Sequence, residues 1–299
     1  MRTWPAFRVR LSLVYAMVEF MGTIDREQND MDKLELHRTI DLSRYPLDKP
    51  DSPEYRSLAT DKRKQLNHNQ YCTMPGFLLD AQRRKIVAAV EKRQQHTHRA
   101  DGQRNVYLQR SRSETLPDDH PRNIFARGSY NMMGAHLLDH DSPLKDIYYW
   151  PPMQQFIADI VGEPRLYPSD DPYQPVNVLC QGNGDCSAWH FDSHNAFTMT
   201  LMLQAPESGG HFEMAPNTRS DRDPNYPGVA KLLLGDNSNT VRVARDEGEL
   251  VIFRGCNSAH RVTPVGGSRL RLMCVMVYET ESGVIGDPVV NETVYGIKA

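Results

Sequence analysis

The sequence predicts an α+β protein with a double-stranded β-helix (jelly roll) core and N-terminal packing helices. Short apolar segments follow one another after about residue 175, glycine-rich turn signals separate them, and helical patterns precede them. Short strands in close succession are typical of sandwiches and jelly rolls. Helices that come before the strands can pack on one face of such a sheet.

The predicted strands are short and rich in apolar residues. They span residues 176–180, 196–203, 211–214, 241–243, 249–253, 259–263 and 270–278. The segments that separate them are typical of turns, and include Gly182-Asn183-Gly184, Ser208-Gly209-Gly210, Asp246-Glu247-Gly248 and Gly266-Gly267. This architecture can bring together residues that lie far apart in the sequence.

Two helical segments are predicted before these strands. The first begins at Asp80, a residue type that accepts hydrogen bonds from the first turn of a helix. The second begins at Ser142-Pro143, because proline is favoured at the first helical position, and it is broken at Pro151-Pro152 and stopped by Gly162. Residues 100–140, between the two segments, are expected to consist mainly of loops.

A domain boundary is expected near residue 70. Residues 1–70 are predicted to be an N-terminal extension, partly irregular with one short helix, and residues 71–299 to be the jelly-roll domain with its helical support. The apolar run 11–21 is interpreted as a poorly packed extension or a helix lying on the main body, with a transit peptide as the alternative. No stretch approaches the roughly 20 apolar residues of a membrane span.

The composition argues against several kinds of partner. The 299-residue chain has a formal net charge of -3, which gives no electrostatic reason to expect nucleic acid or an anionic membrane. Its five cysteines are scattered and form no Cys-x-x-Cys pair, which favours a reducing compartment over a disulfide framework. We therefore expect a cytoplasmic protein that acts on a small molecule, with no indication of its oligomeric state.

Three residues have the pattern of a metal site. His190 and Asp192 form a His-x-Asp pair, and His260 follows at the start of a predicted strand. Two imidazole nitrogens and one carboxylate oxygen can occupy one face of a metal and leave the other open, as in non-haem Fe(II) oxygenases. Trp189 and Phe191 flank the first histidine and a predicted strand follows, which favours a built site over chance.

A second His-x-acid pair competes with the first. His211-Phe212-Glu213 has the same spacing and follows Gly209-Gly210 in a predicted strand. Glycines there are explained by a close approach of two backbones, so we expect Glu213 to be a sheet residue. His194 lies near the first pair, and we expect it to stay near the site without binding the metal.

The open face of the metal suggests a 2-oxo acid as cosubstrate. Such a molecule can fill two of the free positions and leave the third for dioxygen, and its far carboxylate then needs a buried cation. Arginine suits a carboxylate better than lysine because its planar fork donates two parallel hydrogen bonds. Arg269 and Arg271 lie two residues apart on one predicted strand, where they would share a face, and only one is expected to reach the ligand. If the strand 196–203 alternates, the hydroxyl of Thr200 can lie beside the same carboxylate.

The set His190, Asp192, His260 and Arg269 resembles the metal and cosubstrate motif of the Fe(II)/2-oxoglutarate-dependent oxygenases, and the spacing of the arginine is similar to that of the prolyl-hydroxylase-type branch. A wider part of the chain resembles a branch that acts on free amino acids and small metabolites. This wider resemblance is carried by residues 118–121, 171–172, 189–203, 209–213, 216–217 and 219–220.

The resemblance implies an enzyme that uses Fe(II), 2-oxoglutarate and dioxygen to hydroxylate an aliphatic C–H bond, with a free amino acid as substrate. By the same resemblance, Arg127 is expected to bind the carboxylate of the substrate, and Asp171 is a candidate for its amine. Chlorinating members of this branch replace the metal-binding carboxylate by a small residue, so Asp192 disfavours halogenation.

Three other readings stay open. The product could be formed by desaturation or oxidative cyclisation, such as aziridine formation from an amino acid in secondary metabolism. A cupin-like metalloenzyme could use the same metal site without 2-oxoglutarate, and Arg269 would then bind no cosubstrate. The barrel could also be a sensing module that has kept the metal site.

Overall fold

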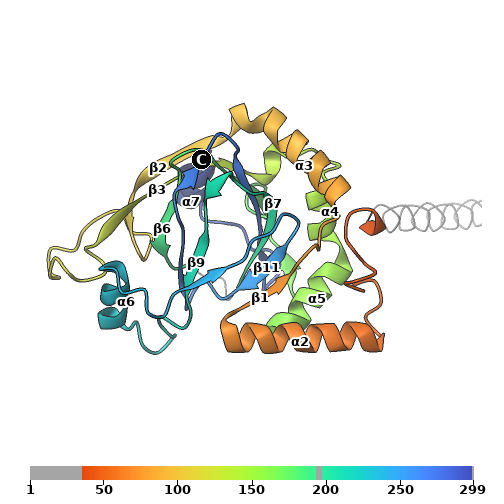
Figure 1. Ribbon diagram of the computed structural model, residues 1–299, viewed down its shortest axis with the longest axis horizontal. Coiled ribbons are helices and arrows are strands. Elements are labelled where there is room, and N and C mark those ends of the chain that lie inside the picture. Colours follow the sequence, from red (N-terminus) through yellow and green to blue (C-terminus); the bar gives the residue numbers. More distant parts are fainter. Residues whose placement is uncertain (1–35, 193–196, 298–299) are drawn as a thin grey trace, which may run out of the picture.

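Two facing antiparallel sheets form the centre of the molecule in the computed structural model, which describes residues 36–192 and 197–297 (Figure 1). The larger sheet runs in the order β1 (Tyr71–Met74), β11 (Leu250–Phe253), β7 (Thr198–Gln204), β14 (Arg271–Met276), β5 (Val176–Gln181), β3 (Phe125–Met133) and β2 (His98–Asn105). The smaller sheet runs in the order β10 (Val241–Val243), β9 (Phe212–Ala215), β12 (Ala259–Val262) and β6 (Ser187–His190). The predicted α+β class with a jelly-roll core is confirmed.

Two short strand pairs complete the β structure. They are β8 (Ser208–Gly209) with β13 (Val265–Gly266), and β4 (Tyr167–Pro168) with β15 (Tyr278–Glu279). The predicted strands correspond to β5, β7, β9, β10, β11, β12 and β14. Their apolar, alternating sequences explain why they could be recognised.

Helices cover the outer face of the larger sheet (Figure 1). They are α2 (Pro53–Asn69), α3 (Asp80–Arg93) with the 3-10 turn η1 (Gln94–His96), α4 (Pro143–Tyr149) and α5 (Pro151–Val161). The predicted start at Pro143, the break at Pro151 and the end at Gly162, which has a φ of 90°, are all confirmed. Two further helices, α6 (Tyr226–Leu233) and α7 (Pro288–Tyr295), and the 3-10 turn η2 (Ala135–Leu137) were not predicted.

The segment before residue 70 contains more structure than one short helix. Ser52 accepts a hydrogen bond from the backbone N–H of Tyr55 and so caps the 17-residue helix α2. The Tyr55 ring lies 5.6 Å from that of Phe156 in α5, and its hydroxyl donates to Asp159 over 2.7 Å. Residues 36–70 therefore share the core of the domain, while the run 11–21 lies outside the described residues. The division at residue 70 stays a prediction.

The region 100–140 is loop-rich as expected, but it also contains two strands that were not predicted. β2 and β3 form a long antiparallel hairpin, with His98 paired to Met132 at one end and Asn105 to Phe125 at the other. Most side chains of β2 are polar, so the strand lacks the alternation of apolar residues by which strands are recognised.

Strand β7 shows how the larger sheet separates its two faces. Met199, Leu201 and Leu203 belong to the apolar core beneath the helices. Thr198 and Thr200 alternate with them and therefore point between the two sheets, as the sequence predicted. Polar groups are thus directed into the space between the sheets.

None of the helices in the part of the chain that the structure describes has the length and apolarity needed to cross a membrane.

Candidate active site

The two predicted histidine ligands lie on neighbouring strands of the smaller sheet. His190 ends β6, His260 lies in β12, and the antiparallel register pairs them directly. Directly paired residues project from the same face of a sheet, and the two imidazole centroids are 4.2 Å apart. Asp192 follows β6, with its Oδ1 3.4 Å from His260 Nε2 and 4.0 Å from His190 Nε2. Strand pairing therefore brings the three side chains together.

Backbone carbonyls fix the orientation of both imidazoles. The Nδ1 atom of His190 lies 2.8 Å from the carbonyl oxygen of Ala188, and that of His260 lies 3.1 Å from the carbonyl oxygen of Ser258. A carbonyl can only accept, so each Nδ1 carries the proton and each Nε2 keeps its lone pair. Burial, and then the electrostatic effect of the neighbouring His260, lower the pKa of His190 to about 4. Its ring is therefore neutral at pH 7, the form that binds metals.

Asp192 is held as an ionised carboxylate. Burial alone would raise its pKa, but His260, His190 and the hydroxyl of Thr198, which donates to Oδ2, together bring the pKa below its usual range. The carboxylate also lies against the backbone of Gly255, where an added Cβ would be only 1.9 Å from Oδ2. Position 255 can therefore hold only glycine while the carboxylate keeps this place.

The donor set fits a mononuclear iron site. The ligand atoms of His190, Asp192 and His260 all lie within 4.8 Å of one another. Two neutral imidazoles and one carboxylate are the facial set of non-haem Fe(II) enzymes. This is the one such group of metal-binding side chains among residues 36–192 and 197–297.

The competing pair has another role. Phe212 and Met214 of β9 point into the apolar core between the sheets, so Glu213 points away from it. Its carboxylate binds Arg261 over 2.7 Å and Arg242 over 3.2 Å. Glu213 is thus a sheet residue, in agreement with the sequence interpretation, while His194 lies outside the described residues.

The two arginines proposed for the cosubstrate do not share a face. β14 begins only at Arg271, and Arg269 precedes it on the surface, where its guanidinium binds Glu247 over 2.7 Å. Its side chain is 44% exposed. Arg271 is buried between the sheets and donates to Gln181 Oε1 over 2.8 Å and to the carbonyl oxygen of Gly210 over 3.1 Å. The structure therefore brings Arg271 toward the site and leaves Arg269 outside it.

Sequence reasoning missed a second inward arginine. Arg245 lies two residues after β10, and its Nη1 donates to Oγ1 of Thr200 over 2.9 Å. Its Nε and Nη2 atoms are shielded from solvent and have no partner among the described residues. Burial, and then the positive charge of Arg271, lower the pKa of Arg245. No feature of the sequence marked this arginine, because it follows a three-residue strand in a turn-rich segment.

The ring of Phe212 lies between Arg245 and the metal triad. Its guanidinium carbon is 4.2 Å from the centre of the Phe212 ring, and that ring is 5.6 Å from the imidazole of His260. Glu249 acts on the Arg245 guanidinium from a distance, but no carboxylate among the described residues accepts a hydrogen bond from its Nε or Nη2. Buried donors without acceptors are costly, and an organic carboxylate would supply those acceptors. The residues present therefore fit a 2-oxo acid whose far carboxylate meets Arg245, Thr200 and the neighbouring Arg271.

A large cavity opens beside the metal ligands. It has a volume of about 810 Å³ and is lined by His190 and Asp192, by the hairpin β2–β3 and by one face of α7. Its size is within the range of sites for small organic molecules. The candidate metal site thus has access to a substrate through this cavity.

Arg127, which was expected to bind a substrate carboxylate, is directed elsewhere. Its guanidinium makes two hydrogen bonds of 2.9 and 2.7 Å with Asp101, and its side chain is 53% exposed. The neighbouring residues Ala126 and Gly128 line the cavity, whereas Arg127 does not. Side chains alternate along a strand, so the arginine points away from the metal site.

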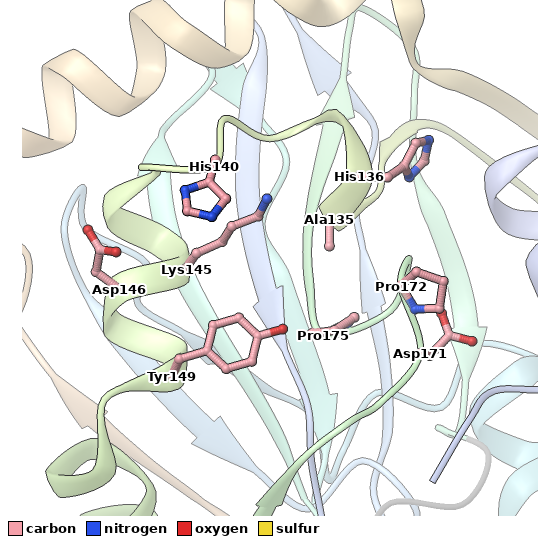
Figure 2. A pocket seen from close by; sticks show the side chains of 9 residues that line it. All are labelled: Ala135, His136, His140, Lys145, Asp146, Tyr149, Asp171, Pro172 and Pro175. Atoms are coloured by element: carbon pink, nitrogen blue, oxygen red, sulfur yellow. The ribbon is translucent and has the colours of Figure 1, made fainter. Parts of the chain in front are cut away.

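Asp171, the candidate for a substrate amine, instead connects its own loop to the C-terminal segment that contains α7. It is 2% exposed and accepts hydrogen bonds from the backbone N–H groups of Tyr173, Gln174 and Gly286 and from Nδ2 of Asn291 in α7. It borders a separate pocket of about 420 Å³ between α4, η2 and the segment 171–175. Figure 2 shows that Lys145 and Tyr149 point into this pocket, while the carboxylate of Asp171 points away from its middle.

Replacing Asp171 by alanine is therefore expected to lower stability. The change leaves one buried and three partly buried donors without their acceptor, and we expect the free energy of unfolding to fall by about 2–4 kcal/mol. Urea unfolding followed by circular dichroism measures this change. The matched control is Asp170→Ala at the exposed neighbouring residue, where a change within about 0.5 kcal/mol is expected. Equal stability of both variants would contradict the anchoring role.

The sequence matches one family model over most of its length. The family is described as HalD, Halogenase D, and the match covers residues 57–297. The chain belongs to the Halogenase D family. This Halogenase D match includes the metal triad, both inward arginines and α7. No curated protein matches the chain.

Solved structures share the fold of this Halogenase D protein at low sequence identity. The epimerase SnoN, in complex with Fe3+, alpha ketoglutarate and nogalamycin RO, is 14% identical with a TM-score of 0.50, over 78% of this chain and 93% of SnoN. AviO1 from Streptomyces viridochromogenes Tue57 is 13% identical with a TM-score of 0.50, over 77% of this chain and 98% of AviO1. The expected resemblance to iron- and 2-oxoglutarate-dependent enzymes is therefore confirmed in the fold.

Proposed function

We propose that the protein is an Fe(II)- and 2-oxoglutarate-dependent dioxygenase that hydroxylates an aliphatic C–H bond of a small metabolite, a free amino acid. Arg245 is the observation that carries the proposal. Its Nε and Nη2 atoms are shielded from solvent and have no partner among the described residues, and the Phe212 ring lies between its guanidinium and His260. A metal site that bound no organic anion would leave these two buried donors without an acceptor.

The side chains would divide the work of holding the reactants. His190, Asp192 and His260 would hold the iron, and Thr198 would keep the carboxylate of Asp192 in place. Together with 2-oxoglutarate and dioxygen, bound iron would supply an oxidant strong enough to break an aliphatic C–H bond.

The cosubstrate would be anchored at its far end. Arg245 and Arg271 would bind that carboxylate, with the hydroxyl of Thr200 beside it. The rings of Phe212 and Phe253, which are 5.1 Å apart, would exclude water from the space between this carboxylate and the metal.

The carboxylate of Asp192 favours oxygenation over halogenation. A halide can bind the metal only where the protein leaves a ligand position free, and Asp192 fills that position here. Membership of the Halogenase D family therefore does not imply that this chain halogenates.

Desaturation or oxidative cyclisation of an amino acid, such as aziridine formation in secondary metabolism, is the second candidate. It needs the same metal, cosubstrate and cavity and differs only after the C–H bond is broken.

Two further features support parts of the proposal. The unpartnered atoms of Arg245 disfavour a cupin-like metalloenzyme or sensor that binds no 2-oxo acid. All five cysteines are free, in keeping with the proposed cytoplasmic location.

Turnover with a panel of free amino acids tests the proposal. The protein is loaded with Fe(II) and 2-oxoglutarate without oxygen, mixed with each amino acid, and then exposed to oxygen. We expect one amino acid to stimulate succinate release and to gain one oxygen atom in mass. A loss of two hydrogen atoms would instead identify desaturation or cyclisation. Oxidation of the amino acid at the same rate without 2-oxoglutarate would overturn the proposal.

A further inference from the structure

The arginines of the hairpin β2–β3 differ in whether their charge is already neutralised. Arg99 in β2 binds both carboxylate oxygens of Asp185 over 2.7 and 2.9 Å, and Arg127 in β3 is bound by Asp101. Arg104, also in β2, lines the same cavity, and the described residues offer its side chain no hydrogen bond or ion pair. It is half-buried. A half-buried guanidinium in this position has donors available for a ligand.

Arg104 lies on the metal side of the cavity. It is paired with Ala126, which also lines the cavity, and His190 and Asp192 line the same cavity. An anionic group bound by Arg104 would therefore hold the rest of the molecule close to the metal.

A single acidic side chain of α7 faces the same cavity. Glu292 lines it together with Val290, Thr293 and Val294, and its carboxylate has no partner within residues 36–192 and 197–297. The neighbouring Asn291 is buried and bound by Asp171 and Gln174, so the position of this helix face is fixed. α7 packs against both β2 and β3. The cavity thus has an unpaired, half-buried cation in β2 and an unpaired anion on its helix wall, while the exposed Arg110 follows β2 at the same cavity.

We propose that Arg104 binds the carboxylate of the substrate and that Glu292 attracts its ammonium group, so that the cavity selects zwitterionic molecules. The inference rests on the proposed function and names the residues that recognise the substrate. It replaces Arg127 by Arg104 as the carboxylate-binding residue. Arg104 carries most of the selectivity, because Glu292 is exposed and exposed charges are screened by solvent.

Binding without oxygen tests this inference separately from turnover. The probes are the proteinogenic L-amino acids and their α-carboxamides, titrated by calorimetry into protein that holds Fe(II) and 2-oxoglutarate. The visible absorbance of the Fe(II)–2-oxoglutarate complex is recorded first for every variant. This signal shows that the fold and the cosubstrate site are intact, and its absence in the wild-type protein would count against the proposed function instead.

We expect the tightest-binding amino acid to bind the wild-type protein at least about 10-fold more tightly than its carboxamide, as for a charge-assisted hydrogen bond. In Arg104→Gln this preference should disappear, and in Arg104→Lys part of it should remain. Glu292→Gln should weaken binding by about 2- to 5-fold. The matched control Arg127→Gln should keep the wild-type preference.

Three results would overturn the inference. They are an unchanged preference for the carboxylate in Arg104→Gln, a loss of that preference in Arg127→Gln, and a failure of every amino acid to bind the wild-type protein while the Fe(II)–2-oxoglutarate absorbance is present.

Discussion

The Asp192→Ala variant is expected to lose substrate-dependent succinate formation completely. The substitution removes the only carboxylate of the triad and leaves two imidazoles, which bind Fe(II) weakly. Loss of a group that only orients a ligand already costs about 10- to 100-fold in metal affinity, so loss of the ligand itself should cost more than about 100-fold. Iron content after dialysis and succinate release with the active amino acid measure the two effects.

Glu213→Ala is the matched control for this variant. It removes the acid of the competing His-x-Glu pair, whose carboxylate binds Arg261 and Arg242 outside the site. We expect it to retain iron and most of the activity. Full activity in Asp192→Ala, or loss of iron in Glu213→Ala alone, would show that the metal site has been assigned to the wrong pair.

The Arg245→Met variant is expected to bind 2-oxoglutarate more weakly without losing stability. Methionine can fill the space along Phe212 without a charge, so the metal-free protein should be at least as stable as the wild type. The affinity for 2-oxoglutarate should fall by about 100-fold or more, because a shielded carboxylate loses a charged partner. Thermal unfolding without metal and titration of 2-oxoglutarate into the Fe(II)-loaded protein measure the two quantities.

The same change at Arg269 provides the comparison. Arg269→Met removes a surface ion pair with Glu247, and such pairs contribute little. We expect its affinity for 2-oxoglutarate to stay within about 3-fold of the wild type. If Arg269→Met lost 2-oxoglutarate binding and Arg245→Met kept it, the cosubstrate would have to bind outside the space between the sheets.

The metal site could be predicted from the sequence because its signals are local. His190 and Asp192 are two residues apart, and His260 stands at the start of a recognisable strand. The alternation of β7 also correctly predicted that Thr200 points inward. These inferences needed only the two-residue period of a strand.

The cosubstrate and substrate residues could not be predicted in the same way. Arg269 does not reach the site because β14 begins only at Arg271, and Glu207 accepts a hydrogen bond from the backbone N–H of Arg269 outside the sheet. Arg104 lies in a polar strand that was taken for a loop. Whether an arginine is free depends on partners such as Asp101 and Asp185, and their distances are set by the fold.

The direct pairing of His190 with His260 has a consequence for folding. β6 is an edge strand of the smaller sheet and β12 is its only neighbour there. A metal held by both histidines would act as a cross-link between them, closing a loop of about 70 residues in the unfolded chain. Such a cross-link restricts the unfolded state in the way that a disulfide does. The bound ion would thus fix the register of the edge strand and stabilise the jelly roll.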